Sequence, residues 1–282
     1  MSERKFKLTT ESKINAWHIE LFRIEATVDF RNGDNEIKKG DKGGWIEKES
    51  DLSGNAWVYG NAEVFGNARV FGNARVFGNA RVFGNAEVFG NAEVYGNAEV
   101  FGDARVYGNA KVYGDARVYG NARVYGNAEV FGNARVFGNA RVYGNAMVYG
   151  NAMVYGNAWV FDNAMVYGNA MVYGNAMVYG NAWVFDNAMV YGNAMVYGNA
   201  WVSGNARLIA KSAYTKGRFV GGDDSETPKF TNITDKTGSN YWRNQYVIGD
   251  YEISEIEPKA VETSEAEPEI ITLNGKRYKI IK

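Results

Sequence analysis

The sequence predicts an all-β fold, a single-stranded parallel β-helix (β-solenoid) with a cap at each end. A six-residue unit, G-N-A-x-V-[F/Y], runs without insertion or deletion from Gly54 to Ile209, giving 26 copies. Within a unit the Ala and Val lie two residues apart, so both point to one face of a strand. A period of six excludes an amphipathic helix, whose apolar face recurs every 3.6 residues. One short strand cannot bury its apolar face alone, but stacked coils can.

Gly-Asn follows each short strand and predicts a corner, because both residues tolerate a positive φ. No proline precedes Pro228, so the repeats lose no backbone donor to proline. Each unit is therefore expected to form one strand and one corner, with Val and Ala inside.

The x position of the unit indicates three units, or 18 residues, per coil. From Glu63 to Arg141 every x residue is charged. Residues 18 apart carry opposite charges in 8 of 11 pairs, whereas residues of neighbouring units do so in only 5 of 13. Opposite charges directly across adjacent strands are stabilising, which favours the 18-residue coil.

The spacing of aliphatic and small residues carries a resemblance to a known family. Val58 is followed four residues later by Ala62, and the same holds up to Val202 and Ala206. This pattern resembles the hexapeptide-repeat proteins that form left-handed parallel β-helices, and the resemblance alone implies the left hand. One departure is that the residue after the aliphatic position is aromatic here, where the family often has Gly.

Residues 1–41 are expected to form an N-terminal β cap. Lys13–Phe30 alternates, which predicts one or two strands, and Asn32-Gly33-Asp34 is a turn signal. The register extends backward through Gly44 and Ile46, so the solenoid is assigned to residues 42–215. The segment 38–56 resembles the entry region of uncharacterised bacterial and phage-encoded hexapeptide-repeat proteins, a resemblance that implies no established activity.

Three further segments follow the solenoid. Residues 216–251 are predicted to form a loop-rich C-terminal cap and 252–269 an acidic linker. In 270–282, Asn274-Gly275 between apolar alternations predicts a β-hairpin that docks on its own chain or on a partner.

The composition argues against several classes of protein. The net charge of −1 does not favour a bulk polyanion binder, and the absence of cysteine excludes disulfides and thiolate metal sites. No signal peptide or long apolar run is present, so the expected location is cytoplasmic, in a bacterial host if the chain is phage-encoded.

The sequence predicts no enzyme, cofactor or metal site. Many hexapeptide-repeat proteins are acyltransferases with a histidine near a coil corner, but the only histidine, His18, lies outside the repeats and is expected to be structural. Corner aspartates are expected to serve turns. They are Asp103, Asp115, Asp162 and Asp186.

The outer surface changes character near Met147. Beyond it the x position holds only Met or Trp, an apolar stretch that monomers rarely expose. We expect this half to be covered by a second copy, by the C-terminal segments or by a protein partner. Its residues, the Met/Trp set, are Met147, Met153, Trp159, Met165, Met171, Met177, Trp183, Met189, Met195 and Trp201.

A weakly basic band lies next to the Met/Trp set. Arginines stacked at 18-residue spacing, Arg105, Arg123 and Arg141 on one face and Arg117 and Arg135 on the next, alternate with tyrosines. This combination suits nucleotides, although a solvated band is the simpler interpretation. The members of this Arg/Tyr band are Arg105, Arg117, Arg123, Arg135, Arg141, Tyr107, Tyr119, Tyr125 and Tyr143.

The function expected from these features is that of a non-enzymatic binding or structural protein. It would act by self-assembly or by docking on a protein partner, and the phage-like ends would allow a host factor as that partner. The alternatives are a nucleotide or small-molecule sponge using the Arg/Tyr band, an acyltransferase of the hexapeptide family, and an ice-binding solenoid. The absence of threonine from the repeats disfavours the last of these.

Overall fold

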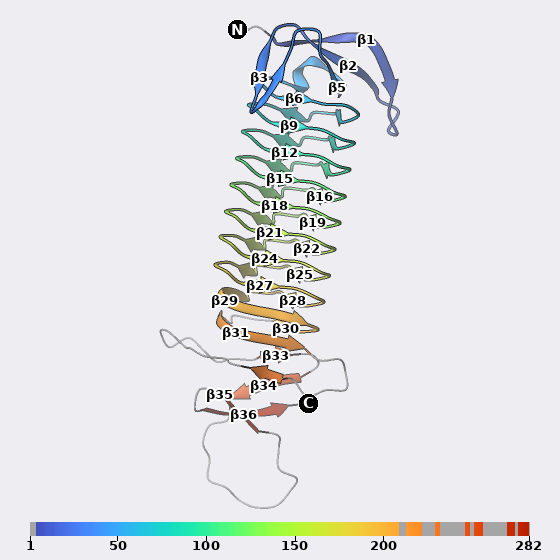
Figure 1. Ribbon diagram of the computed structural model, residues 1–282. Coiled ribbons are helices and arrows are strands. Elements are labelled where there is room, and N and C mark those ends of the chain that lie inside the picture. The colour runs from blue at the N-terminus through green and yellow to red at the C-terminus, as the bar shows by residue number, and fades with distance from the viewer. Residues whose placement is uncertain are drawn as a thin grey trace, which may run out of the picture.

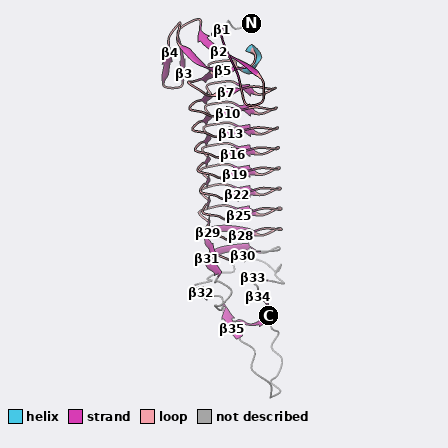
Figure 2. Cartoon of the chain, turned by 90° about the vertical axis from the view of Figure 1, so that its right-hand side faces the viewer, coloured by secondary structure: helices cyan, strands magenta, loops and turns pink. Residues whose placement is uncertain are grey.

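A computed structural model of the chain describes residues 4–208 and, beyond them, the backbone of six strands. The molecule is a rod of stacked coils (Figure 1). Viewed from the side, the strands of successive coils form straight rows along the rod (Figure 2). The parallel β-solenoid with 18 residues per coil is confirmed, because each repeat strand pairs in parallel with the strand 18 residues later, as Arg81 with Glu99.

The repeat strands form three rows, here called columns 1, 2 and 3. Column 1 contains β5 (Lys42–Ile46), β7 (Glu63–Val64), β10 (Arg81–Val82), β13 (Glu99–Val100), β16 (Arg117–Val118), β19 (Arg135–Val136), β22 (Met153–Val154), β25 (Met171–Val172), β28 (Met189–Val190) and β30 (Arg207–Leu208). Column 2 contains β8 (Arg69–Val70), β11 (Glu87–Val88), β14 (Arg105–Val106), β17 (Arg123–Val124), β20 (Arg141–Val142), β23 (Trp159–Val160) and β26 (Met177–Val178). Column 3 contains β6 (Trp57–Val58), β9 (Arg75–Val76), β12 (Glu93–Val94), β15 (Lys111–Val112), β18 (Glu129–Val130), β21 (Met147–Val148), β24 (Met165–Val166) and β27 (Trp183–Val184). Column 2 and column 3 merge in β29 (Met195–Gly204).

The interior of the rod is made of the Val and Ala of every unit. From Ala62 to Ala206 these side chains have no exposed surface. Backbone hydrogen bonds join each coil to the next, for example Arg123 N to Ala140 O at 2.9 Å and Tyr125 N to Val142 O at 3.0 Å. The same six-residue unit therefore buries its Val and Ala and hydrogen-bonds to the next coil at every step along the rod.

The corners depend on glycine. Gly120 has a φ of 69°, and a Cβ on it would lie 3.1 Å from Gly138 N in the next coil. A side chain at this position would therefore be unfavourable for two reasons. The backbone is left-handed, and the next coil lies too close to the Cβ.

The N-terminal end is covered by two hairpins and a short helix. Strand β1 (Phe6–Ile14) pairs antiparallel with β2 (Glu20–Ala26), which pairs with β5, and β3 (Phe30–Asn32) pairs with β4 (Asn35–Ile37). The 3-10 helix η1 (Glu49–Asp51) follows β5. The predicted turn at Asn32-Gly33-Asp34 is confirmed. The prediction of one or two strands from Lys13 to Phe30 is confirmed, because this segment contains the end of β1 and all of β2, with a turn at Asn15–Ile19 between them.

The backward extension of the repeat register is also confirmed. Ile46 pairs in parallel with Val64, and Leu52 pairs with Val70. Gly44 occupies an Ala position because a Cβ there would lie 2.6 Å from a methyl carbon of Val58.

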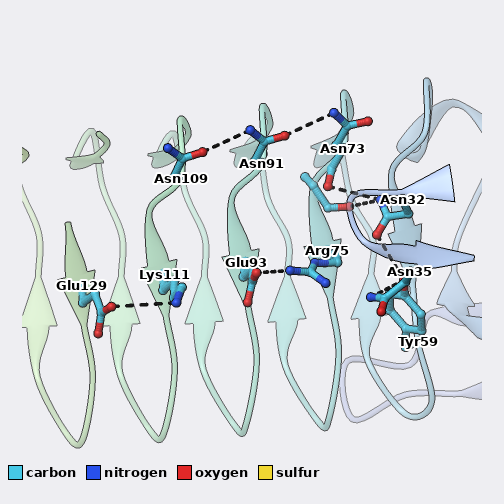
Figure 3. A network of polar contacts seen from close by, with 11 residues as sticks. Asn32, Asn35, Tyr59, Asn73, Arg75, Asn91, Glu93, Asn109, Lys111 and Glu129 are labelled. Atoms are coloured by element: carbon cyan, nitrogen blue, oxygen red, sulfur yellow. Dashed lines mark hydrogen bonds and ion pairs between the residues drawn. The ribbon is translucent and has the colours of Figure 1, made fainter. Parts of the chain in front are cut away.

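A buried asparagine closes the N-terminal end of column 3. The Nδ2 of Asn32 donates to the backbone oxygens of Asn55, Asn73 and Ala74, and its Oδ1 accepts from the hydroxyl of Tyr59 at 3.1 Å (Figure 3). This side chain binds carbonyls of the first coils of column 3, so it takes part in terminating the stack.

The C-terminal strands close the other end. Strand β31 (Ala213–Gly221) pairs in parallel with β29 and antiparallel with β32 (Lys229–Thr231), and it spans the solenoid boundary predicted at residue 215. A second sheet contains β33 (Tyr246–Ile248), β34 (Tyr251–Glu255), β36 (Lys276–Ile281) and β35 (Ile270–Leu273) in that order. Strands β35 and β36 pair antiparallel, with Leu273 opposite Lys276.

Several predictions for this end lie outside the described residues. They include most of the loop-rich cap, residues 256–269 of the acidic linker, and the turn residues Asn274 and Gly275. The division of the chain into domains stays a prediction.

Candidate functional surface

The outer surface is set by the x residue and the aromatic residue of each unit. Because they flank the buried Val, both point outward on the same face, and successive coils place identical positions in rows. The aromatic rings of each column stack face to face, with centroids 4.8 Å apart for Tyr107 and Tyr125 and also for Tyr155 and Tyr173. The rows therefore run along the rod at the strand spacing.

The aromatic rows are half-buried by their own stacking. Burial raises the pKa of Tyr149 and Tyr155 above the ordinary tyrosine value. Burial and the nearby Glu129 carboxylate together raise the pKa of Tyr113, whose hydroxyl donates to Glu129 Oε2 at 2.9 Å. At neutral pH these hydroxyls are protonated and available as hydrogen-bond donors.

The first half of the rod holds carboxylates between cations. In column 2, Glu87 pairs with Arg69 on one side and with Arg105 Nε at 3.0 Å on the other. In column 1, Glu99 pairs in the same way with Arg81 and with Arg117 Nε at 3.1 Å. Each Glu therefore uses both of its oxygens, one for each neighbouring coil.

As the 18-residue spacing predicts, the arginines of the Arg/Tyr band lie on two columns. Arg105, Arg123 and Arg141 are direct neighbours in column 2, beside the stacked Tyr107, Tyr125 and Tyr143. Arg117 and Arg135 are neighbours in column 1, where Tyr119 stacks between Phe101 and Phe137. The arginines on column 2 form the longer run, and Arg141 lies 4.7 Å from the ring of Trp159.

The Met/Trp set occupies all three columns. Column 1 has Met153, Met171 and Met189, column 2 has Trp159, Met177 and Met195, and column 3 has Met147, Met165, Trp183 and Trp201. Stacking along the columns leaves most of these side chains half-buried. Trp201 is the exception with 38% exposed, and its ring stacks on Trp183 at 4.8 Å.

The two Trp-Val-Phe-Asp copies fall on different columns, as their 24-residue spacing predicts. Trp159 lies in column 2 and Trp183 in column 3. The two Trp-Val-Phe-Asp motifs therefore do not stack on each other along one face of the rod.

Comparison with known families supports the repeat assignment. The family model described as YdcK Beta solenoid repeat matches residues 110–126, 116–130, 128–144, 140–156, 148–160, 170–186 and 188–204. These segments all lie in the stacked coils, which pair at 18-residue spacing. The chain is a repeat β-helix protein. No curated protein matches it, and no enzyme family is indicated.

The possible catalytic and metal-binding groups of this repeat β-helix protein are dispersed. His18 has a φ of 62° and lies in the turn between β1 and β2, where its N–H donates to Asn15 O at 3.1 Å. Within the described part of the chain, no three His, Asp or Glu side chains are grouped so that they could hold a metal ion. In the same part of the chain, no helix is long and apolar enough to cross a membrane.

The corner aspartates have two structural roles. Asp103 and Asp115 accept hydrogen bonds from Asn85 at 3.0 Å and Asn97 at 2.9 Å, within rows of asparagine side chains. Asp162 and Asp186 take the place of the corner glycine, and each accepts an N–H from the next coil, Gly180 and Gly204 respectively, at 3.1 Å. The sequence predicts that these aspartates serve in turns, and the structure shows which group each of them hydrogen-bonds.

Two features of the surface were missed by the sequence reasoning. The first is the asparagine row, in which Asn73 donates to Asn91 and Asn91 to Asn109, each at 3.1 Å (Figure 3). The 18-residue coil together with an Asn in each unit contained the signal for it. The second is Trp17 of the β1–β2 turn, whose ring packs on Phe65 and Phe83 at 5.1 Å with Arg81 over it at 4.8 Å. No periodic pattern of the sequence points to that contact.

Proposed function

We propose that this protein is a non-enzymatic structural rod that self-associates through its Met/Trp set, chiefly through column 3. The observation that carries the proposal is the run of four apolar x residues in that column, Met147, Met165, Trp183 and Trp201, directly after the charged run that ends at Glu129. The run ends at the exposed Trp201.

The chemistry of column 3 fits a protein contact. Trp is enriched among residues that dominate interface energies, and Met adapts its shape to a partner. In the neighbouring aromatic row, Tyr149 and Tyr167 supply hydroxyl donors beside the apolar run. An interface of this kind combines an apolar centre with a polar margin.

A second copy fits this surface better than an irregular partner. Two identical rods carry side-chain rows at the same spacing, so a single contact between coils repeats for each further coil. A two-fold arrangement would place the column 3 surface of one rod on that of the other. Nothing in this arrangement requires a catalytic group.

Light scattering of the purified full chain at high salt, where contacts between charged groups are screened, tests the proposal. We expect a mass above that of the monomer at micromolar concentration. The variant Met147→Lys/Met165→Glu/Trp183→Lys should be monomeric, because it replaces apolar surface with charge. Its alternating charges continue the Arg75, Glu93, Lys111 and Glu129 pattern of the same column, so the fold should be retained.

A matched control separates loss of apolar surface from loss of packing. Met147→Leu/Met165→Leu changes shape while keeping the column apolar, and it should still associate. A monomeric wild type, or a charged variant that remains associated, would overturn the proposal.

A further inference from the structure

Column 2 contains a run of three arginines, of which only the first pairs with a carboxylate among the described residues. Arg105, Arg123 and Arg141 face one another directly across adjacent strands. Like charges in this position are destabilising. Arg105 is paired with Glu87, but among the described residues neither Arg123 nor Arg141 forms an ion pair.

The same column shows what such arginines bind when a carboxylate is available. Glu87 lies between Arg69 and Arg105 and pairs with both. In column 3, Glu129 lies near Lys111 Nζ at 3.9 Å and also accepts from the hydroxyl of Tyr113. A carboxylate on this surface is thus held by a cation of the same column and, in column 3, by a tyrosine of the preceding coil as well.

The Arg105–Arg141 run offers these groups to an external ligand. Arg123 is exposed, and the stacked Tyr107, Tyr125 and Tyr143 lie beside the three arginines. Arg141 is held over the ring of Trp159, which leaves its guanidinium edge for hydrogen bonding. The row is therefore a linear set of cations at intervals of about 4.8 Å, with hydroxyl donors alongside.

We infer that this arginine row binds the acidic stretch of a second copy of the chain, with Glu265, Glu267 and Glu269 as its anchors. These glutamates alternate along the sequence, so in an extended segment their carboxylates point to one side about 7 Å apart. Arginine side chains are long enough to accommodate the difference from the coil spacing. Three carboxylates would then meet three guanidinium groups.

The length of the chain makes this a contact between copies. Glu265 precedes Ile270, the first residue of β35, by five residues, which span at most about 18 Å. Arg141 and Arg207 are 66 residues apart, so Arg141 lies more than three coils, or about 18 Å, from the coil of Arg207. Strand β35 lies beyond that coil, past the end of the solenoid (Figure 1). Glu269, one residue before β35, therefore does not reach Arg141, so one chain cannot pair all three of these glutamates with its own arginine row.

A labelled synthetic peptide of residues 260–270 provides the probe, with fluorescence anisotropy against the full-length protein as the measurement. We expect saturable binding that weakens with salt. Arg123→Glu should weaken it by roughly tenfold or more, since a carboxylate would replace the central cation. The same substitution should raise the melting temperature, because it recreates between Arg105 and Arg141 the arrangement of Glu87 between Arg69 and Arg105.

Three controls test whether binding depends on the charges of this row and of the three glutamates. Arg135→Glu changes the net charge equally but lies in column 1, so it should reduce peptide binding less than twofold. A peptide with all three glutamates replaced by glutamine should not bind. A peptide carrying lysine at these three positions should bind the triple variant Arg105→Glu/Arg123→Glu/Arg141→Glu.

Three results would overturn the inference: no binding of the acidic peptide, equal losses for Arg123→Glu and Arg135→Glu, or tighter binding of a dT oligonucleotide than of the peptide. The inference does not rest on the column 3 interface. The variant Met147→Lys/Met165→Glu/Trp183→Lys should still bind the peptide, so failure of either idea is seen separately.

Discussion

At the scale of single residues, the corner of each coil shows how closely the coils are packed. Most corners have glycine at a positive φ, with the next coil near the position of a Cβ, as for Gly144 and the backbone N of Asp162 at 2.9 Å. Asp162 itself has a Cβ and a φ of 59°, yet its Oδ2 accepts the N–H of Gly180. The hydrogen bond offsets part of the conformational cost.

This offset predicts an unusual order of stability at position 162. Asp162→Ala keeps the Cβ and the left-handed backbone but loses the acceptor, so it should lower the free energy of unfolding by about 1–2 kcal/mol. Asp162→Gly loses the same acceptor and removes the strain, so it should change stability by less than about 0.5 kcal/mol. Denaturant unfolding measures both. An alanine variant as stable as wild type would show that the hydrogen bond contributes nothing, and equal stability of the alanine and glycine variants would show that the left-handed backbone costs nothing.

At the scale of elements, the N-terminal end contains the carboxyl group with the largest pKa shift among the described residues. Asp51, at the end of η1, is buried, and burial raises its pKa to about 7 although its Oδ2 accepts the N–H of Lys48 at 3.1 Å. The other acids with shifted pKa values, Glu11 and Asp29, are exposed, and hydrogen bonds from Lys42 and Lys39 lower their pKa values. Asp51 therefore responds to pH in a direction opposite to that of ordinary ion-paired acids such as Glu11.

The sign of the effect follows from proton binding. An unfolded Asp releases its proton near pH 4, whereas folded Asp51 keeps it until about pH 7. The folded state binds more protons in this interval, so the stability contributed by Asp51 is complete below pH 4 and is lost as the pH rises to 7. In thermal melts from pH 4 to 8, Asp51→Asn should remove this decline relative to wild type. Parallel curves for the two proteins would contradict the assignment.

The repeats could be predicted from the sequence far better than the caps. The repeats contain the same features many times: an inner Val and Ala, a glycine corner and an 18-residue coil. Each feature is therefore visible as a period in the sequence. The contacts of Asn32 with Ala74 and of Trp17 with Phe83 occur once and join residues far apart in the chain. A unique contact of this kind leaves no period to detect.

The candidate surface was predictable only in part, for a related reason. The 18-residue spacing correctly placed Arg105, Arg123 and Arg141 in one row. It did not reveal that Met165 is half-buried by its own column, or that Arg141 packs on Trp159. Those properties depend on side-chain packing between coils.

At the scale of the whole molecule, the chain is a one-dimensional stack in which each coil contacts only its neighbours. Removing a multiple of six residues keeps every inner Val and Ala in place. Removing 18 residues also keeps each column intact, whereas removing six turns everything beyond the deletion by one face. The two deletions should therefore change distances along the rod in different ways.

The chain has no cysteine, so two labels can be placed without competition. In an Asn79→Cys/Asn187→Cys variant, spin labels on one edge of the rod are six coils apart, about 29 Å. Deleting residues 147–164 removes one coil and should shorten the distance to about 24 Å. Deleting residues 147–152 moves the second label to another edge, which adds a lateral offset of about 16 Å and should lengthen the distance to about 32 Å. If the smaller deletion shortened the distance instead, the three-unit coil would be contradicted, and circular dichroism of each variant would verify that the β-structure is retained.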